Sequence, residues 1–244
     1  MAKKKLGRGK CVHCLKDVEE RNSDHVFPDS WYPDSTPANL EKWQIPSCIP
    51  CNSEYGKLEQ DFLLKVGLCL DPFDPASASI VRKSLRSLKP AAARNPRDAQ
   101  HRLGKGRQIL SQALVGDQIP DHGVFPGLGD HWNIPGERTA ILIPADSFKR
   151  ITEKIVRGIF YIEEQKFIEP PYKVEFFALF NEGAAFIEQT LDKFGTVYAR
   201  EPGIVVRRAV APEDGISSLF AIEFWKQFKT YASVTSNDHA AEGA

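Results

Sequence analysis

Four cysteines in two C-x-x-C pairs are the residues whose types and spacing most directly indicate chemistry in this sequence. Cys11 and Cys14 form the first pair, and Cys48 and Cys51 form the second. Two such pairs supply the four soft ligands that a tetrahedral structural zinc ion prefers. The fifth cysteine, Cys69, lies in an apolar run and is interpreted as a core residue. The sequence therefore predicts a structural Zn²⁺ site at the two pairs, and no disulfides.

Polar residues suited to catalysis lie between the two pairs and directly after the second. Asp24 and His25 are neighbours in the gap, and Asn52 follows Cys51. Zinc would draw these segments together, so that oxygen atoms of Asp24 and Asn52 share a hard divalent cation. In an extended strand, His25 points to the side opposite Asp24 and could activate a water there. The alternative is a polar turn with an ordinary surface histidine.

The segment 11–57 resembles the HNH nuclease family, the ββα-metal fold, in its zinc-containing form. The matching positions occur in the family's order and are Asp24-His25 with Pro28, then Asn39-Leu40, then Asn52 and Lys57. The resemblance implies that His25 is the general base and that Asn39 ties the loop and orients His25. It also implies that Asp24 and Asn52 hold a catalytic Mg²⁺ or similar ion. The match covers roughly a quarter of the chain.

Two features depart from the family pattern. The last motif position is often histidine, and Asn52 is a weaker ligand, which leaves the preferred metal open. The glycine pair common between the first two motifs is absent, and residues 29–38 replace it. Trp31 and Tyr32 in this stretch could stack on a base. Packing in the core of a small domain is the interpretation that we prefer for them.

The mechanism implied by the resemblance is one-metal phosphodiester hydrolysis. A neutral His25 takes a proton from water, and the cation stabilises charge on the phosphate and on the departing 3′ oxygen. The sequence thus predicts a metal-dependent DNA endonuclease. The alternative from another class is a catalytically silent zinc module that binds nucleic acid. A toxin or defence effector is a third possibility and is compatible with the first.

Charge is segregated along the chain although the formal net charge is +0. Residues 1–10 carry five basic and no acidic side chains, and residues 76–110 carry nine basic and one acidic, whereas residues 11–75 are acidic. Such stretches suit a protein that holds a polyanion beside a cation site, or they are solvated tails. The side chains predicted to contact the DNA backbone are Lys57, Arg82, Lys83, Arg86, Arg94, Arg97, Arg102, Lys105 and Arg107.

The hydrophobic patterns predict an α+β protein with a mainly antiparallel sheet in its C-terminal part. Helices are expected at 76–88, 146–160 and 182–194, and strands at 139–143, 172–180, 197–200, 203–210, 219–224 and 228–234. The predicted segments are a basic tail (1–10), the nuclease module (11–70), a basic, irregular, Pro/Gly-rich connector (71–136), a separate α+β domain of unknown role (137–234) and a frayed tail (235–244).

Other polar residues carry weaker signals. His13 is expected to face solvent, and Glu54 and Glu59 are expected to be solvated on the first helix. The segment 129–133 (Gly-Asp-His-Trp-Asn) has the composition of a site but is interpreted as a loop. Neither a secretory signal nor an apolar run long enough to cross a bilayer is present. We therefore expect a cytoplasmic protein that binds DNA and does not enter a membrane.

Overall fold

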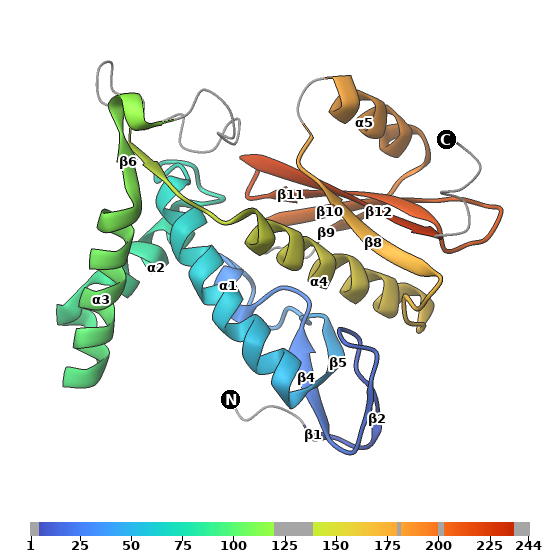
Figure 1. Ribbon diagram of the computed structural model, residues 1–244, viewed down its shortest axis with the longest axis horizontal. Helices are drawn as coiled ribbons and strands as arrows, with labels where there is room; N and C mark the ends of the chain where they lie inside the picture. Colours follow the sequence, from blue (N-terminus) through green and yellow to red (C-terminus); the bar gives the residue numbers. More distant parts are fainter. Residues whose placement is uncertain (1–4, 120–138, 180–181, 200–202, 237–244) are drawn as a thin grey trace.

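The computed structural model describes residues 5–119, 139–179, 182–199 and 203–236, and it confirms the predicted α+β class (Figure 1). The segment 129–133 and the two chain ends, 1–4 and 237–244, lie outside the described residues. Among the described helices, none is both long enough and apolar enough to span a lipid bilayer. Three parts follow one another along the chain: an N-terminal module, a helical pair, and a five-stranded sheet with a helix on each face.

A β-hairpin followed directly by a helix forms the centre of the N-terminal module. Strands β4 (Arg21–His25) and β5 (Gln44–Cys48) pair antiparallel, and β1 (Lys5–Leu6) extends the sheet beside β4. Helix α1 (Ile49–Cys69) starts at the residue after β5, with a proline in its first turn, where the fixed φ angle of proline favours helix initiation. A short ribbon of β2 (Gly9–Lys10) and β3 (Asp17–Val18) carries the first cysteine pair in its turn.

The segment predicted to be an irregular connector contains two helices, and only one of them was expected. Helix α2 (Ala78–Leu88) agrees with the prediction, but α3 (Pro96–Gln112) was missed. Its start is well specified, because the Asn95 side chain accepts a hydrogen bond from the backbone N–H of Asp98 at 2.9 Å and Pro96 takes the first helical position. Two glycines inside α3 concealed the helix, although each costs only about 1 kcal/mol there.

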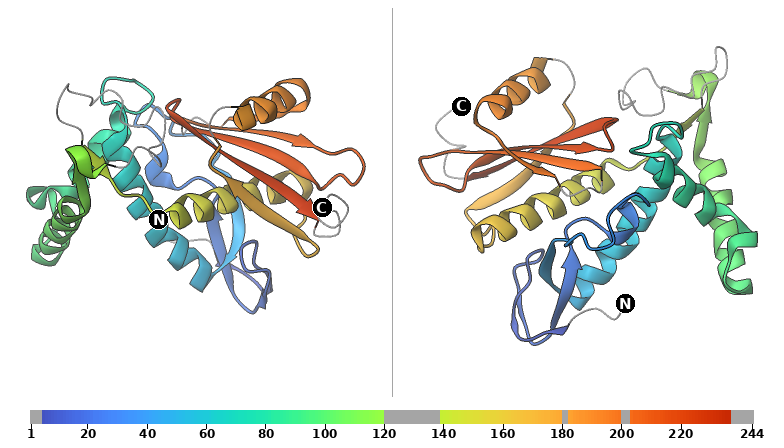
Figure 2. Two further views of the ribbon diagram at one scale, coloured as in Figure 1. Left: turned by 45° about the horizontal axis from the view of Figure 1, so that its top comes forward. Right: turned by 180° about the vertical axis from the view of Figure 1, so that it is seen from behind.

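Short elements lie between these larger ones. They are the single turns η1 (Asp29–Trp31), η2 (Pro90–Ala92) and η3 (Gly116–Gln118), together with the paired strands β6 (Ala113–Val115) and β7 (Thr139–Ile141). The first of them, η1, belongs to the N-terminal module. Helix α3 packs against α2 and stands out from the rest of the molecule (Figure 2).

The C-terminal part is a five-stranded antiparallel sheet in the order β8-β12-β11-β10-β9. The strands are β8 (Tyr172–Phe177), β9 (Thr196–Ala199), β10 (Ile204–Val210), β11 (Ser218–Phe224) and β12 (Phe228–Ser236). Helix α4 (Ala145–Glu164) covers one face and α5 (Glu182–Phe194) covers the other (Figure 1). These elements confirm the predicted sheet and both predicted helices to within a few residues.

A single hydrophobic cluster joins the N-terminal module to the sheet. Trp31 packs on Phe62 with ring centroids 5.5 Å apart and meets Trp225 of the turn after β11 at 5.8 Å. The Trp225 indole N–H also donates to the backbone oxygen of Trp31 at 3.4 Å. The burial of Trp31 and Tyr32 confirms that they pack in the core. The described residues of 139–234 therefore share a hydrophobic cluster with the module, and α4 lies between the module and the sheet (Figures 1 and 2).

Candidate metal centre and active site

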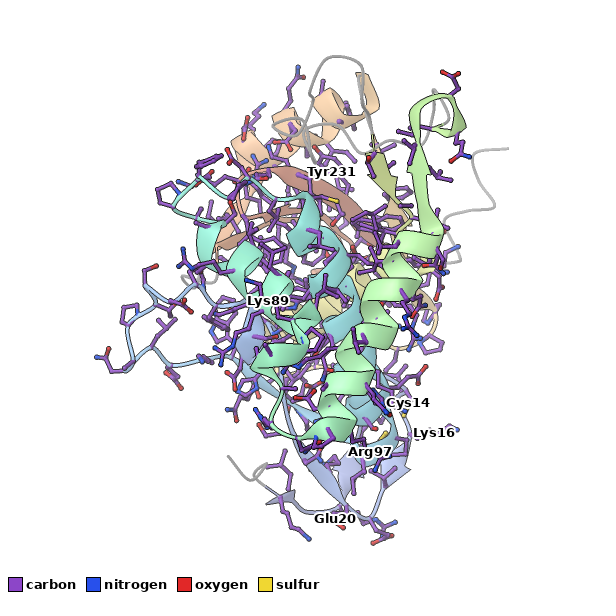
Figure 3. All side chains as sticks on the ribbon, turned by 90° about the vertical axis from the view of Figure 1, so that its left-hand side faces the viewer. Cys14, Lys16, Glu20, Lys89, Arg97 and Tyr231 are labelled. Atoms are coloured by element: carbon purple, nitrogen blue, oxygen red, sulfur yellow. The ribbon has the colours of Figure 1, made fainter. Side chains whose placement is uncertain are left out.

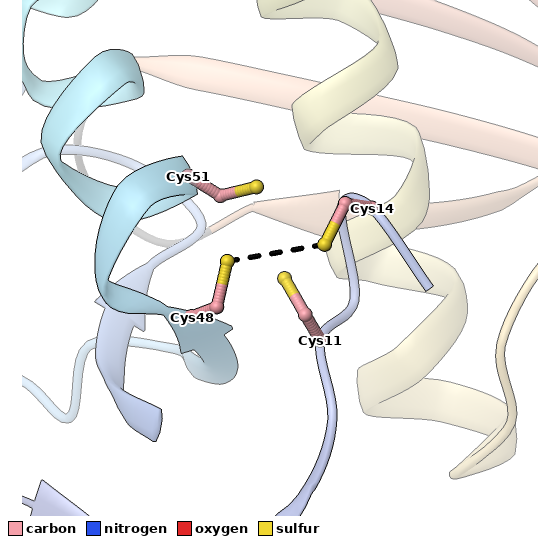
Figure 4. A group of neighbouring side chains, drawn as sticks. All are labelled: Cys11, Cys14, Cys48 and Cys51. Atoms are coloured by element: carbon pink, nitrogen blue, oxygen red, sulfur yellow. Dashed lines mark hydrogen bonds between the residues drawn. The ribbon is translucent and has the colours of Figure 1, made fainter. Parts of the chain in front are cut away.

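The two cysteine pairs come together at one end of the N-terminal module (Figure 4). Cys11 and Cys14 lie in the turn between β2 and β3, Cys48 ends β5, and Cys51 lies in the first turn of α1. Their four sulfur atoms all lie within 4.8 Å of one another, and those of Cys14 and Cys48 are 3.8 Å apart. Four sulfurs about 2.3 Å from a tetrahedral ion are separated by about 3.8 Å. The cluster can therefore hold a metal ion, and its cysteines form no disulfide.

Electrostatics within the cluster also favour a bound cation. Burial acts to raise the pKa of the Cys11 thiol, but the backbone N–H groups of Cys48, Cys14 and His13 outweigh it and lower this pKa to about 7. The pKa values of Cys48 and Cys51 are instead raised, chiefly by burial; the neighbouring sulfurs add to this for Cys51, whereas hydrogen bonds from Cys51 oppose it for Cys48. A divalent cation would supply the positive charge that these sulfurs need to ionise.

Asn52 connects the helix to the strand that carries the Asp-His pair. It directly follows the cluster in α1, and its side-chain amide donates to the backbone oxygen of Ser23 at 3.2 Å and to the Asn22 side chain at 2.9 Å. It is 3% exposed. The amide N–H groups of Asn52 thus fix the start of α1 against β4, which explains why an amide side chain stands here.

Asp24 lies on the buried face of β4 and already has two partners. Its Oδ2 accepts a hydrogen bond from His13 Nε2 at 3.1 Å, and its two oxygens lie 3.1 and 3.2 Å from the Lys154 ammonium of α4. Lys154 also forms an ion pair with Glu59 of α1. Burial acts to raise the pKa of Asp24, but the hydrogen bond from His13 and the charge of Lys154 outweigh it and lower this pKa.

Two expectations about polar residues were wrong at this point. His13 does not face solvent, since its side chain is 2% exposed, and burial lowers its pKa against the opposing effect of Asp24. Glu59 is not solvated but buried. His13 packs against the Tyr55 ring of α1 with centroids 4.4 Å apart and bonds to Asp24, whereas Glu59 is paired with Lys154 of α4, which is distant in sequence. Glu54 is exposed as expected and pairs with Arg150 at 2.7 Å.

His25 ends β4 and lies on the opposite face of the strand from Asp24. Its side chain is 29% exposed, with Nε2 at 3.1 Å from Nε2 of Gln44 and 3.8 Å from Oδ1 of Asp29. Burial lowers the pKa of the imidazole, against the charges of Asp29 and Asp24. His25 is therefore neutral at pH 7 and reachable from solvent. The structure does not bring its imidazole and the Asp24 carboxylate to one shared face.

Gln44 is the residue near His25 that the sequence analysis missed. Its side-chain oxygen accepts a hydrogen bond from the Ser23 hydroxyl, which fixes the amide beside the imidazole. A hollow of about 310 Å³ borders Gln44 and is lined by Leu6, Arg21, Ser23, Gln44, Ile45, Pro46 and Tyr161. The cross-strand pair His25↔Gln44 places this amide by register, and only a correct strand pairing would have revealed it.

Asn39 does not contact His25 among the described residues. It lies exposed in the turn where the backbone N–H of Leu40 donates to the Pro37 oxygen at 3.0 Å. In this conformation, therefore, no hydrogen bond between Asn39 and His25 supports the orienting role that the resemblance implies for Asn39. The side chain in contact with the imidazole is Gln44.

The predicted DNA-contacting residues divide into two groups. The first group makes local contacts. Lys83 donates a hydrogen bond to the backbone oxygen of Tyr32, and both Lys83 and Arg82 form ion pairs with Asp34. Arg102 forms an ion pair with Asp98. The exposed members are Lys57, Arg86, Arg94, Arg97 and Arg107, and Lys105 is half-buried. Figure 3 looks onto the side of α2 and α3, where Lys89 and Arg97 lie on the outer helical pair.

Comparisons with protein-family models, with curated proteins and with solved structures found no match to this chain. The resemblance to the HNH family therefore stays a prediction from the motif residues.

Proposed function

We propose that the protein is a metal-dependent endonuclease that hydrolyses phosphodiester bonds in DNA, with His25 as its general base. The observation that carries this proposal is the position of His25 at the end of β4, in a hairpin and helix joined by the cysteine cluster and by Asn52. Burial keeps the imidazole neutral at pH 7, as a base must be. A hollow of about 310 Å³ lies on the other side of Gln44, and His25 is not part of its lining.

We infer that the metal in the cysteine cluster is structural Zn²⁺. Four sulfurs form a closed tetrahedral set, which leaves no position for water or substrate. When bound, the ion would hold the turn between β2 and β3 against the start of α1, and so fix the hairpin that carries His25. Free cysteines in this number suit a reducing compartment, and we place the protein in the cytoplasm.

The catalytic ion, Mg²⁺ or another divalent cation, belongs to the same proposal. Asp24 would hold it with an amide oxygen of Asn52. Because Asp24 and His25 lie on opposite faces of β4 in this conformation, the end of the strand must rearrange before the ion and the imidazole act on one phosphate. The Gln44 amide N–H donates to the imidazole in this conformation, so the substrate must displace it before Nε2 accepts a proton from water. The exposed basic side chains of α2 and α3 would contact phosphates without reading sequence.

A catalytically silent zinc module that binds nucleic acid is the second candidate. The observation in its favour is the Lys154 ammonium at the Asp24 carboxylate, which satisfies the charge that a catalytic ion would otherwise neutralise. In this case the module would recruit or position nucleic acid and His25 would have no catalytic role.

Supercoiled plasmid distinguishes the two candidates. The zinc-loaded protein is incubated with plasmid and Mg²⁺ or Mn²⁺, beside His25→Ala and the matched control His101→Ala on exposed α3. The enzyme predicts nicking by the parent and by His101→Ala, and a loss of about 10²–10⁴-fold in His25→Ala. The rate should also fall at acid pH, and because burial lowers the pKa of His25 the fall should be centred below the ordinary histidine value of about 6.5. Intact plasmid in every sample, with retained binding, would establish the silent module.

A further inference from the structure

Lys154 is the most deeply buried charged side chain that the proposed mechanism does not use. Its side chain is 1% exposed, and its ammonium lies between carboxylates from two other elements, Asp24 of β4 and Glu59 of α1. The Tyr55 ring lies 5.5 Å from the same nitrogen, which adds a cation–π contact. Two elements that are far from α4 in sequence thus surround its cation.

Helix α4 approaches the nuclease module through residues that share one face. Arg150, Lys154 and Gly158 are spaced at four-residue intervals, which places them in a row along the helix. Arg150 pairs with Glu54, Lys154 pairs with Asp24, and a Cβ added at Gly158 would meet Val26 Cγ2 at 2.8 Å. Val26 follows His25 directly, so α4 is in contact with the strand that carries both proposed catalytic side chains.

The charges around Lys154 define a position for a cation. Two carboxylates from different elements lie at this one ammonium, and Asp24 also accepts a hydrogen bond from the His13 N–H. A buried carboxylate must have a counter-ion, because an unpaired charge in a low-dielectric interior is strongly disfavoured. An ammonium and a hard divalent cation both satisfy that requirement, but both cannot occupy the same place.

We infer that Lys154 is a built-in counter-ion that competes with a divalent cation for the carboxylates of Asp24 and Glu59. This inference rests on the proposed function, because Asp24 is the carboxylate assigned to the catalytic ion. While Lys154 is in place, the position is filled and the nuclease module is held inactive by α4. A divalent ion binds when the ammonium leaves, and Glu59 then becomes its second carboxylate ligand.

Terbium luminescence measures this competition without DNA. Tb³⁺ is a hard ion that replaces divalent cations at oxygen sites, and the Tyr55 ring can sensitise its emission. Zinc-loaded parent protein is titrated beside Lys154→Met, which keeps the aliphatic volume and removes the charge. The matched control is Arg150→Met, one turn earlier on the same face of α4. We expect Lys154→Met to bind Tb³⁺ at least tenfold more tightly than the parent, and Arg150→Met to bind like the parent.

Asp24→Asn in the Lys154→Met background should abolish the gain. If Lys154→Met loses its zinc or its circular dichroism, the same comparison is made between Glu59→Gln and Lys154→Met/Glu59→Gln, which leaves one buried carboxylate instead of two. Equal Tb³⁺ affinity with and without the lysine would overturn the inference, and so would a gain that survives Asp24→Asn.

The outcome is independent of the plasmid assay. If Lys154→Met binds Tb³⁺ more tightly but no variant cuts DNA, the counter-ion role of Lys154 is supported and the nuclease proposal is contradicted. If the parent cuts DNA but Lys154→Met binds Tb³⁺ like the parent, the nuclease proposal is supported and the counter-ion role is contradicted. If both proposals hold, Lys154→Met should nick plasmid faster than the parent at the same Mn²⁺ concentration.

Discussion

Each cysteine of the cluster supplies one sulfur to a closed set, so the loss of any one leaves a vacancy in the coordination of zinc. Cys51→Ser replaces a thiolate in the first turn of α1 with a poor zinc ligand. We expect the purified variant to have lost most of its zinc, measured by inductively coupled plasma mass spectrometry, while the parent retains one ion per chain.

Cys69→Ser is the matched control for this substitution. Cys69 lies at the far end of the same helix, outside the cluster, and burial raises the pKa of its thiol to about 11. Its removal should leave the zinc content unchanged. Equal zinc in both variants would contradict a four-sulfur site.

At the same scale, the sequence predicted the ligands but not their surroundings. The cysteines are recognisable because their type and short spacing alone specify a metal ligand set. One of the two partners of Asp24 is Lys154, 130 residues further along the chain, and no local pattern connects these two residues. Asn39 shows the converse: its motif position matched, but its side chain lies in an exposed turn.

Among the elements, α1 contains two glycines in opposite environments. A Cβ at Gly67 would lie 2.0 Å from the Ser84 hydroxyl oxygen of α2, whereas a Cβ at Gly56 meets no described atom within 4 Å. Gly67 is thus a point where α1 and α2 approach each other closely. We expect Gly67→Ala to lower the free energy of unfolding by about 1–3 kcal/mol through overpacking. Urea denaturation followed by circular dichroism measures the change.

Gly56→Ala serves as the control on the same helix. Alanine loses less backbone entropy in a helix than glycine, so this variant should gain about 0.5–1 kcal/mol. A destabilisation of equal size in the two variants would show that helix propensity, and not the contact with Ser84, decides the outcome.

Elements with a strong repeat in hydrophobicity were predictable, and the others were not. Helix α4 buries Phe148, Ile151, Ile155 and Ile159, whose spacing marks one face. Helix α3 buries only Ile109 among the described residues, so it has almost no apolar face to recognise. Its capping residues, Asn95 and Pro96, carried the only local signal.

For the molecule as a whole, the shared core predicts that the cysteine cluster and the sheet unfold together. Trp225→Ala removes a buried ring that contacts Trp31, and it should cost about 3–5 kcal/mol. With Co²⁺ in the cluster, its visible absorption reports the N-terminal module alone, and far-ultraviolet circular dichroism reports the helices and strands of the whole chain. Both urea midpoints should shift by the same amount.

Phe186→Ala provides the comparison, because this ring on α5 is 69% exposed and lies outside the shared core. It should leave both midpoints in place. Two separate transitions in the parent, or a shift confined to the circular dichroism signal of Trp225→Ala, would mean that the module is stable without the sheet.

The shared core also has a consequence for synthesis. The hairpin and α1 leave the ribosome well before α4 and the turn that contains Trp225, so Phe27, Trp31 and Phe62 have no cover while the later residues are being made. A nascent chain of this protein thus exposes an aromatic surface, prone to aggregation, until translation is nearly finished. Chaperones that recognise such surfaces have a long interval in which to act on it, and a prematurely terminated chain would expose it permanently.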